Sequence, residues 1–395
     1  MIRNECTYDV LIVGGGPAGL SVAETLSPNL RCLIVHQDAE IGLPVRTSGC
    51  SWEQDLRVLN IPRHLYHLLD QMEFYADTSQ SAHTLTKNKA AVLDVTALYR
   101  YLADNSNHPN RHLRCATKYL KSTPIKGGYS VTLRPKSESV YKINCRMIVD
   151  ASGWQNAVVS ELGHAPKPTR IGVGVEYEMP IGTMRPDTGI LFLGTAIPSG
   201  YGWAFPDANG HIRIGAGIIK PNINSNPRAL LDQYLQSDAP ARMGLTPGPI
   251  LQVNAGTLPS EPYDPQLVYG NIVRTGDSAN FATPTVGEGL RLVIEYGRLL
   301  GECLNAHLQQ GDPLALKRYE AVCAKAFVHN YRIGFATNRR IARYAPADFD
   351  ATVHRIASLS EQEAVALIRS EFPQAMILDL GRRYLLGRLK RILRR

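Results

Sequence analysis

The chain has 395 residues, of which 44% are hydrophobic and 20% are charged, as in an ordinary globular protein. Its formal net charge is +8, but the last fifteen residues, 381–395, hold seven Lys or Arg and no acid. The other residues together carry only +1, so a uniformly basic nucleic-acid-binding surface is excluded and no nucleic-acid partner is expected.

The sequence shows no pattern typical of a membrane-spanning helix, a signal peptide, a disulfide framework or a zinc site. No apolar run reaches the roughly 20 residues that span a bilayer, and the N-terminus shows no signal-peptide pattern. The seven cysteines are scattered without a CxxC pair, which argues against a disulfide framework and a zinc site. We therefore expect a cytoplasmic protein without a bound metal.

A glycine-rich turn opens the chain. Val10–Val13 reads as a buried parallel strand, and the residues that follow it form a G-x-G-x-x-G pattern leading into a helix: Gly14, Gly16, Pro17, Ala18 and Gly19. Such a turn lets the backbone approach a pyrophosphate, which the helix N-terminus also attracts. The strand at Arg31–Val35 should then end in an acid that binds a ribose, but His36 and Gln37 stand there and Asp38 follows. His36 or Gln37 could still bond to the ribose hydroxyls.

A second glycine-bearing turn lies about two-thirds along the chain. Ile272–Thr275 reads as a strand that ends at Gly276 and Asp277, and a long amphipathic helix follows the segment that holds Pro284, Gly287, Glu288 and Gly289. With both turns present, the chain resembles the FAD-dependent oxidoreductases of the glutathione-reductase-like superfamily. It is similar to the para-hydroxybenzoate hydroxylase branch, and within it most similar to the geranylgeranyl reductase family, over most of residues 8–340.

The resemblance implies a set of FAD contacts. Gly276 and Asp277 would bind the ribityl and pyrophosphate side of FAD, and the helix beginning near Gly287 would point its positive end at the flavin ring. The segment Glu40–Cys50 matches a family loop that passes along the flavin, which makes Arg46, Thr47 and Ser48 cofactor-binding candidates. Three positions depart from the family pattern, all around the adenosine and pyrophosphate. His36 stands in place of the family's acid, Val95 after Asp94 in place of an arginine that touches FAD, and Ser152 before Gly153 in place of an aspartate.

Short β-like runs fill the region from about Lys167 to Val268 and predict an antiparallel substrate sheet. The run "YGWAFP" matches the Y-x-W-x-F-P signature of geranylgeranyl reductases with Tyr201, Trp203, Phe205 and Pro206. Alternate residues of a strand share a face, so three rings would stand together. We predict that they line an apolar substrate pocket beside the flavin; the alternative is an aromatic core strand.

Three residues are candidates for catalysis: Tyr201, Trp203 and Cys50. Tyr201 and Cys50 are the candidate proton sources, and Cys50 could instead be a small buried filler.

The predicted fold is α/β. A discontinuous Rossmann-like FAD-binding domain covers 1–80, 94–166 and 268–311, and an antiparallel β substrate domain covers 81–93 and 167–267. A helical region covers 312–395. Its tail, 381–395, sets an apolar stripe among arginines, which suits either peripheral contact with an anionic membrane or a docked helix with a solvated basic face.

The predicted activity is FAD-dependent reduction of C=C bonds in an isoprenoid or other apolar substrate, with hydride from reduced flavin N5. Only one dinucleotide fingerprint is present, so NAD(P)H or an electron-donor protein would act as a transient reductant. Three alternatives remain open. One is an oxygen-using monooxygenase or halogenase, for which Lys87 and Lys89 are available lysines; the others are a redox-neutral flavin-dependent cyclase and a non-catalytic protein, with or without bound flavin.

Overall fold

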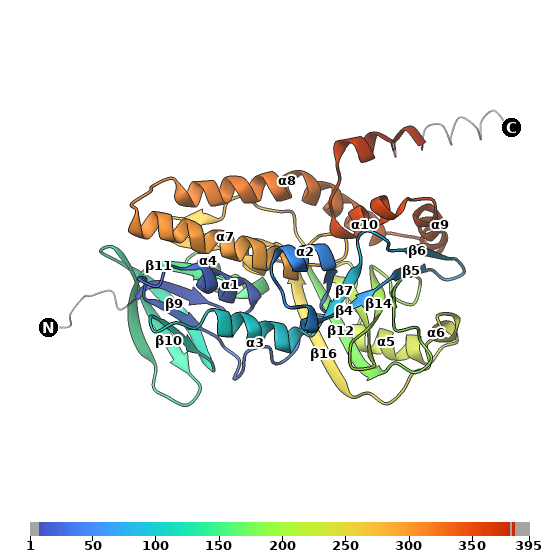
Figure 1. Cartoon of the computed structure of the whole chain (residues 1–395), viewed down its shortest axis with the longest axis horizontal. Helices are drawn as coiled ribbons and strands as arrows, with labels where there is room; N and C mark the ends of the chain where they lie inside the picture. The colour runs from blue at the N-terminus through green and yellow to red at the C-terminus, as the bar shows by residue number, and fades with distance from the viewer. Residues whose placement is uncertain (1–7, 380, 384–395) are drawn as a thin grey trace.

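The computed structural model describes residues 8–379 and 381–383. Most of the predicted basic tail, from residue 384 onward, lies outside these residues, so its membrane contact stays a prediction. Two sheets lie side by side, and helices α7 and α8 run along one side of the first sheet toward the second (Figure 1). In the described part of the chain, no helix is both long and apolar enough to cross a membrane.

The first sheet has eight strands and a parallel centre. Strands β18, β11, β1, β2 and β8 run parallel in that order, while β17 pairs antiparallel to β18, and β10 and β9 extend β11 as an antiparallel meander. The β1 residues Val10, Leu11 and Ile12 are fully buried, because helices and the meander cover both faces of the strand. The strands are β1 (Tyr8–Val13), β2 (Cys32–Val35), β8 (Arg111–Arg114), β9 (Thr117–Ile125), β10 (Gly128–Pro135), β11 (Tyr141–Asp150), β17 (Val268–Tyr269) and β18 (Ile272–Arg274).

Helix α1 (Pro17–Thr25) packs closely against α7 (Leu290–Gln309) because α7 carries glycines at the contact. A Cβ atom on Gly297 would lie 2.8 Å from the Ala18 carbonyl oxygen, and one on Gly301 would lie 2.5 Å from the Val22 carbonyl oxygen. Two parts of the chain that are far apart in sequence are thereby held together beside β1.

The second sheet has the order β16-β12-β15-β14-β13-β5-β6. All its pairs are antiparallel except β13 with β5. The strands are β5 (Gln71–Tyr75), β6 (Gln80–Thr84), β12 (Ile171–Pro180), β13 (Thr188–Phe192), β14 (Gly200–Pro206), β15 (His211–Lys220) and β16 (Gln252–Pro259).

The predicted domain boundary at residue 80 differs from the pairing. Strand β5, assigned to the FAD-binding domain, pairs with β13 of the substrate sheet. Strand β7, assigned to the substrate domain, instead forms a small separate sheet with β3 and β4. Strand pairing depends on long-range contacts, which local composition does not reveal. This sheet consists of β3 (Cys50–Trp52), β4 (Tyr66–Leu69) and β7 (Ala90–Leu93).

The C-terminal helices join the two sheets. The first half of α8 packs on α7 through Tyr319, Cys323 and Phe327, whereas α9 and α10 add Phe349 and Val365 to the core of the substrate side. The remaining helices of four or more residues in the described ranges are α2 (Glu53–Val58), α3 (Val95–Asn105), α4 (Ala157–Glu161), α5 (Pro227–Leu235), α6 (Ala239–Arg242), α8 (Ala315–Ile341), α9 (Pro346–Ala357) and α10 (Glu361–Arg369).

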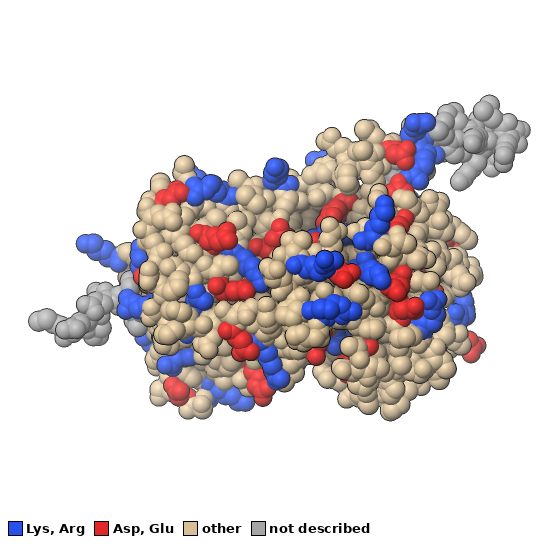
Figure 2. Space-filling view, in the orientation of Figure 1, with Lys and Arg blue, Asp and Glu red and all other residues tan. Residues whose placement is uncertain are grey.

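Acidic and basic side chains are intermixed on the face shown in Figure 2. This agrees with the near-neutral charge of the chain outside its last fifteen residues.

Candidate active site

A cavity of about 710 Å³ lies between the two sheets and the C-terminal helices. Thirteen of the sixteen predicted cofactor residues line it: Gly14, Gly16, Pro17, Ala18, His36, Gln37, Arg46, Thr47, Ser48, Asp277, Pro284, Gly287 and Gly289. The other three, Gly19, Gly276 and Glu288, do not line it. The structure therefore brings most of the two predicted turns to one cavity.

The three glycines of the first turn have different roles. A Cβ atom on Gly14 would lie 2.0 Å from the Ala151 carbonyl oxygen, and one on Gly19 would lie 2.0 Å from the Gly14 carbonyl oxygen. These two positions admit only glycine because backbone atoms are in contact there. A Cβ atom on Gly16 would meet no atom within 4 Å and would point into open space at the N-terminus of α1. Gly16 thus leaves the space that a pyrophosphate needs, and Gly19 is a packing glycine.

The residues that follow β2, which depart from the family pattern, form hydrogen bonds with the glycine turn and with Arg46. The His36 Nδ1 atom accepts a hydrogen bond from the backbone N–H of Gly15 at 3.3 Å, so this histidine supports the glycine turn directly. Burial lowers the pKa of His36, which favours the neutral ring that this bond requires. The Arg46 guanidinium forms two bonds to Asp38, of 2.7 and 3.1 Å. Asp38, the acid that follows His36 and Gln37, is therefore paired with Arg46, the predicted FAD-contacting arginine.

The second turn lies against the first. Gly276 adopts φ +65°, and a Cβ atom there would lie 2.7 Å from the Ala18 Cβ. Gly276 is consequently a contact between the two turns and lies outside the cavity wall. The neighbouring Asp277 carboxylate has no hydrogen-bond partner among the described residues and faces the cavity, and burial raises its pKa to about 6. An unpartnered carboxylate beside an open glycine turn suits the hydroxyl groups of a ribityl chain, so these residues fit FAD.

The loop before α7 is held in place by a backbone hydrogen bond between two of its own residues. The backbone N–H of Gly287 donates to the Thr283 carbonyl at 2.7 Å, and helix α7 begins directly after Gly289. The Glu288 side chain turns away from the cavity, where it accepts hydrogen bonds from Arg291 Nε at 3.0 Å and Ser51 Oγ at 3.4 Å. Its charge stabilises a buried arginine, which explains why this predicted cofactor residue does not reach the cavity.

The aromatic side chains of strand β14 lie partly in the cavity wall and partly in the core. Tyr201 and Trp203 line the cavity, with ring centroids 5.8 Å apart. Phe205 points to the same face of the strand but is packed with Leu69 and Met72, and neither Phe205 nor Pro206 lines the cavity. The prediction that three rings share one pocket was therefore wrong for Phe205, because the small sheet covers that end of the strand.

The candidate proton sources from the sequence are poorly placed. Cys50 does not line the cavity, and burial raises the pKa of its thiol to about 12, with Glu288 adding to the effect. The Tyr201 hydroxyl lies in the cavity wall but donates to the Val286 carbonyl, and burial raises its pKa. Cys50 therefore packs as a half-buried filler against the core, and Tyr201 fixes the loop before α7.

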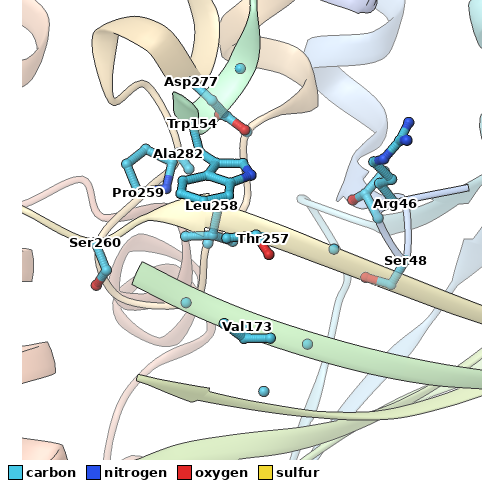
Figure 3. A pocket seen from close by; sticks show the side chains of 18 of the residues that line it. Arg46, Ser48, Trp154, Val173, Thr257, Leu258, Pro259, Ser260, Asp277 and Ala282 are labelled. Carbon is cyan, nitrogen blue, oxygen red and sulfur yellow. The ribbon is translucent and has the colours of Figure 1, made fainter. Parts of the chain in front are cut away.

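Several cavity residues were missed from the sequence. The Trp154 indole lies next to Asp277 and Leu258, across the cavity from Arg46 and Ser48 (Figure 3). Tyr99, on the helix that follows Asp94, faces the cavity near Asp277 and Arg46, in the region where the family arginine is missing. Trp154 follows the Ser152-Gly153 pair directly, and this position could have suggested a role at the cavity.

The apolar end of the cavity is built by both the substrate sheet and the C-terminal helices. Phe74 and Leu191 come from the sheet, whereas the helical region contributes Ile341, Ile356 and Leu367. No motif marked these helical residues in the sequence.

Comparison with known proteins identifies the family. The FAD binding domain family matches residues 7–330. The chain belongs to this family. Two predictions are thereby confirmed: the chain is an α/β FAD-dependent oxidoreductase, and it belongs with the geranylgeranyl reductase group.

The relatives of this FAD-binding protein include digeranylgeranylglycerophospholipid reductase 2 of Methanothermobacter thermautotrophicus, with 23% identity over 92% of this chain and 95% of the relative. A geranylgeranyl bacteriochlorophyll reductase-like protein of Thermoplasma acidophilum shares the fold, with a TM-score of 0.81, 20% identity and coverage of 95% of this chain and 98% of that one. The myxobacterial chondrochloren halogenase also shares it, with a TM-score of 0.66, 16% identity and coverage of 91% and 92%. The fold alone therefore does not separate reductases from halogenases.

Proposed function

We propose that this protein is an FAD-dependent reductase of C=C bonds in an isoprenoid or another long apolar substrate. The observation that carries the proposal is the continuity of the cavity. One end holds the two glycine-bearing turns, and the other is lined by aromatic and aliphatic side chains such as Tyr201, Trp203 and Ile341. The names of the reductases similar to this chain support the same reaction class.

Bound and reduced, FAD would supply a hydride from its N5 atom. The residues of this chain would do the rest. The Gly16 turn and Asp277 would hold the nucleotide and ribityl parts, and the N-terminus of α7 would favour negative charge on the reduced ring. Tyr201 and Trp203 would orient the apolar chain and help to exclude water. NAD(P)H or an electron-donor protein would reduce the flavin transiently.

The placement of lysines favours reduction over halogenation. A halogenase needs a lysine near its substrate, and the sequence offered Lys87 and Lys89. Neither lines the cavity, and the Lys89 ammonium pairs with Asp70 at 2.7 Å. Lys118 does line the cavity, but it follows Thr117, whose backbone N–H donates to the His36 carbonyl, so it lies at the nucleotide end and not beside Tyr201 and Trp203.

Product analysis under anaerobic conditions tests the proposal. The FAD-loaded protein, reduced with dithionite, is incubated with a prenyl substrate, and the product is analysed by mass spectrometry. We expect a gain of two hydrogens for each reduced bond. A product that needs oxygen or halide would instead indicate a monooxygenase or halogenase, and cyclisation without use of reductant would indicate a cyclase.

A further inference from the structure

A buried carboxyl group in the cavity wall has no role in the scheme above. Glu176, on β12, is only 3% exposed, yet it lines the cavity beside Trp203 and Asn254. These side chains lie in one row across the sheet, because Glu176 pairs with Asn254 on β16 and with Gly215 on β15, which in turn pairs with Trp203 on β14.

Two neutral N–H groups hold the carboxyl group in place. Trp203 Nε1 donates to Oε2 at 2.8 Å, and Asn254 Nδ2 donates to Oε1 at 3.0 Å. Each oxygen of a carboxyl group has a second lone pair, so both contacts leave room for an acidic proton. The group is therefore oriented without being neutralised by an ion pair in the described part of the chain.

Three glycines of the sheet leave the space that the Trp203 indole needs in order to reach Glu176. The Trp203 indole lies so close to the sheet that a Cβ atom on Gly215 would be 2.3 Å from its Cζ2 atom. Cβ atoms on Gly174 and Gly217 would lie 3.2 and 3.4 Å from other atoms of the same ring. Side chains at these positions would lift the indole and break its bond to Glu176.

Burial of the carboxyl group favours retention of its proton. Burial raises the pKa of Glu176 and Glu178 on the same strand adds to this, whereas Arg213 on β15 and the two N–H donors act in the opposite direction. The Arg213 guanidinium directs its hydrogen bonds to the Ser48 and Leu93 carbonyls, at 3.0 and 2.9 Å. Another ionisable group in this part of the cavity wall is the Tyr201 hydroxyl on β14, which is bonded to the Val286 carbonyl.

We propose that Glu176 is the proton donor of the reduction, a role that rests on the proposed function. Its O–H bond breaks as a C–H bond forms at one carbon of the C=C bond, while a hydride adds to the other carbon. The two electrons come with the hydride from reduced flavin, which ends oxidised, and the carboxyl group ends as a carboxylate. Solvent returns its proton before the next turnover.

The test compares Glu176→Gln with Glu178→Gln, a matched control two residues along the same strand whose side chain lies outside the cavity. Both variants are loaded with FAD, reduced without oxygen and mixed with the prenyl substrate. We expect Glu176→Gln to keep the substrate Kd but to saturate the bond at least about 100-fold more slowly, the usual range for loss of a general acid. Glu178→Gln should keep the wild-type rate at its pH optimum and move only the alkaline limb of the pH–rate profile slightly downward, because the Glu178 charge adds to the raised pKa of Glu176.

A second readout does not depend on turnover. Infrared difference spectra between acidic and alkaline pH should show a protonated carboxyl band that is present in the wild type and Glu178→Gln and missing in Glu176→Gln. Trp203→Phe removes one donor to the carboxylate, so the alkaline limb of the pH–rate profile should move upward by about one pH unit. This variant also keeps the proposal testable if Glu176→Gln does not fold.

The outcomes separate the two proposals. Full turnover by Glu176→Gln, or an unchanged pH profile in Trp203→Phe, would refute the role of Glu176 alone. Failure of the wild type to saturate any prenyl substrate would refute the proposed reaction and this role with it.

Discussion

Replacing single glycines of the first turn should separate folding from cofactor binding. In Gly19→Ala, the new Cβ atom would lie 2.0 Å from the Gly14 carbonyl oxygen, so the backbone must move. Overpacking of this kind costs about 1–3 kcal/mol, or more where backbone is involved. In Gly16→Ala, the Cβ atom meets no protein atom within 4 Å, so the fold should lose less than about 1 kcal/mol.

FAD binding, in contrast to stability, should be weakened more by Gly16→Ala than by Gly19→Ala. The Cβ atom in Gly16→Ala enters the space that we assign to the pyrophosphate, so the Kd for FAD should rise at least about tenfold, which corresponds to about 1.4 kcal/mol. Thermal unfolding of the FAD-free proteins and FAD titration followed by flavin fluorescence measure the two effects separately. Wild-type affinity in Gly16→Ala, together with wild-type stability in Gly19→Ala, would refute this assignment of the two glycines.

Four further predictions follow from the cavity and its surroundings. Burial raises the pKa of Asp277 from 3.8 to about 6, so the folded FAD-free protein holds this proton more tightly than the unfolded chain does. The free energy of unfolding should therefore fall as the pH rises from about 4 to about 6. Asp277→Asn should flatten this slope in denaturant titrations. Cys50→Ser should keep near-wild-type turnover, because the thiol lies outside the cavity, and a loss of activity with FAD still bound would contradict its role as a filler. Phe205→Ala should lower the free energy of unfolding by about 3–5 kcal/mol, as expected for a core ring, and a change well below that would argue against its burial in the core. Replacing Arg388 and Arg391 by Glu should reduce co-sedimentation with anionic vesicles and leave neutral vesicles unaffected; equal binding by both proteins would argue against membrane contact through the tail.

The parts of the site that the sequence predicted are local in the chain. A glycine turn between a strand and a helix is encoded within a few residues, so Gly14, Gly16 and Pro17 could be placed beside a nucleotide from their order alone. The same holds for Gly276 and Asp277. The contact between the two turns depends on the packing of α1 against α7, which the motifs suggested only through the family resemblance.

The parts that were missed depend on neighbours far apart in sequence. The alternation along β14 gave the correct face for Tyr201, Trp203 and Phe205, but nothing in the strand shows where the small sheet covers it. The Glu176–Trp203 bond joins β12 and β14 across β15, so its two residues are not neighbours in any local pattern. The glycines that make room for the indole read in the sequence only as weak strand residues.

The central claim is that the two glycine-bearing turns hold one FAD in the cavity between the sheets. It is tested most directly by adding FAD to the purified full-length protein, removing the excess and recording the absorbance spectrum. The account predicts one FAD per chain, with oxidised-flavin bands near roughly 370 and 450 nm. A folded protein that stays colourless after this treatment would contradict it.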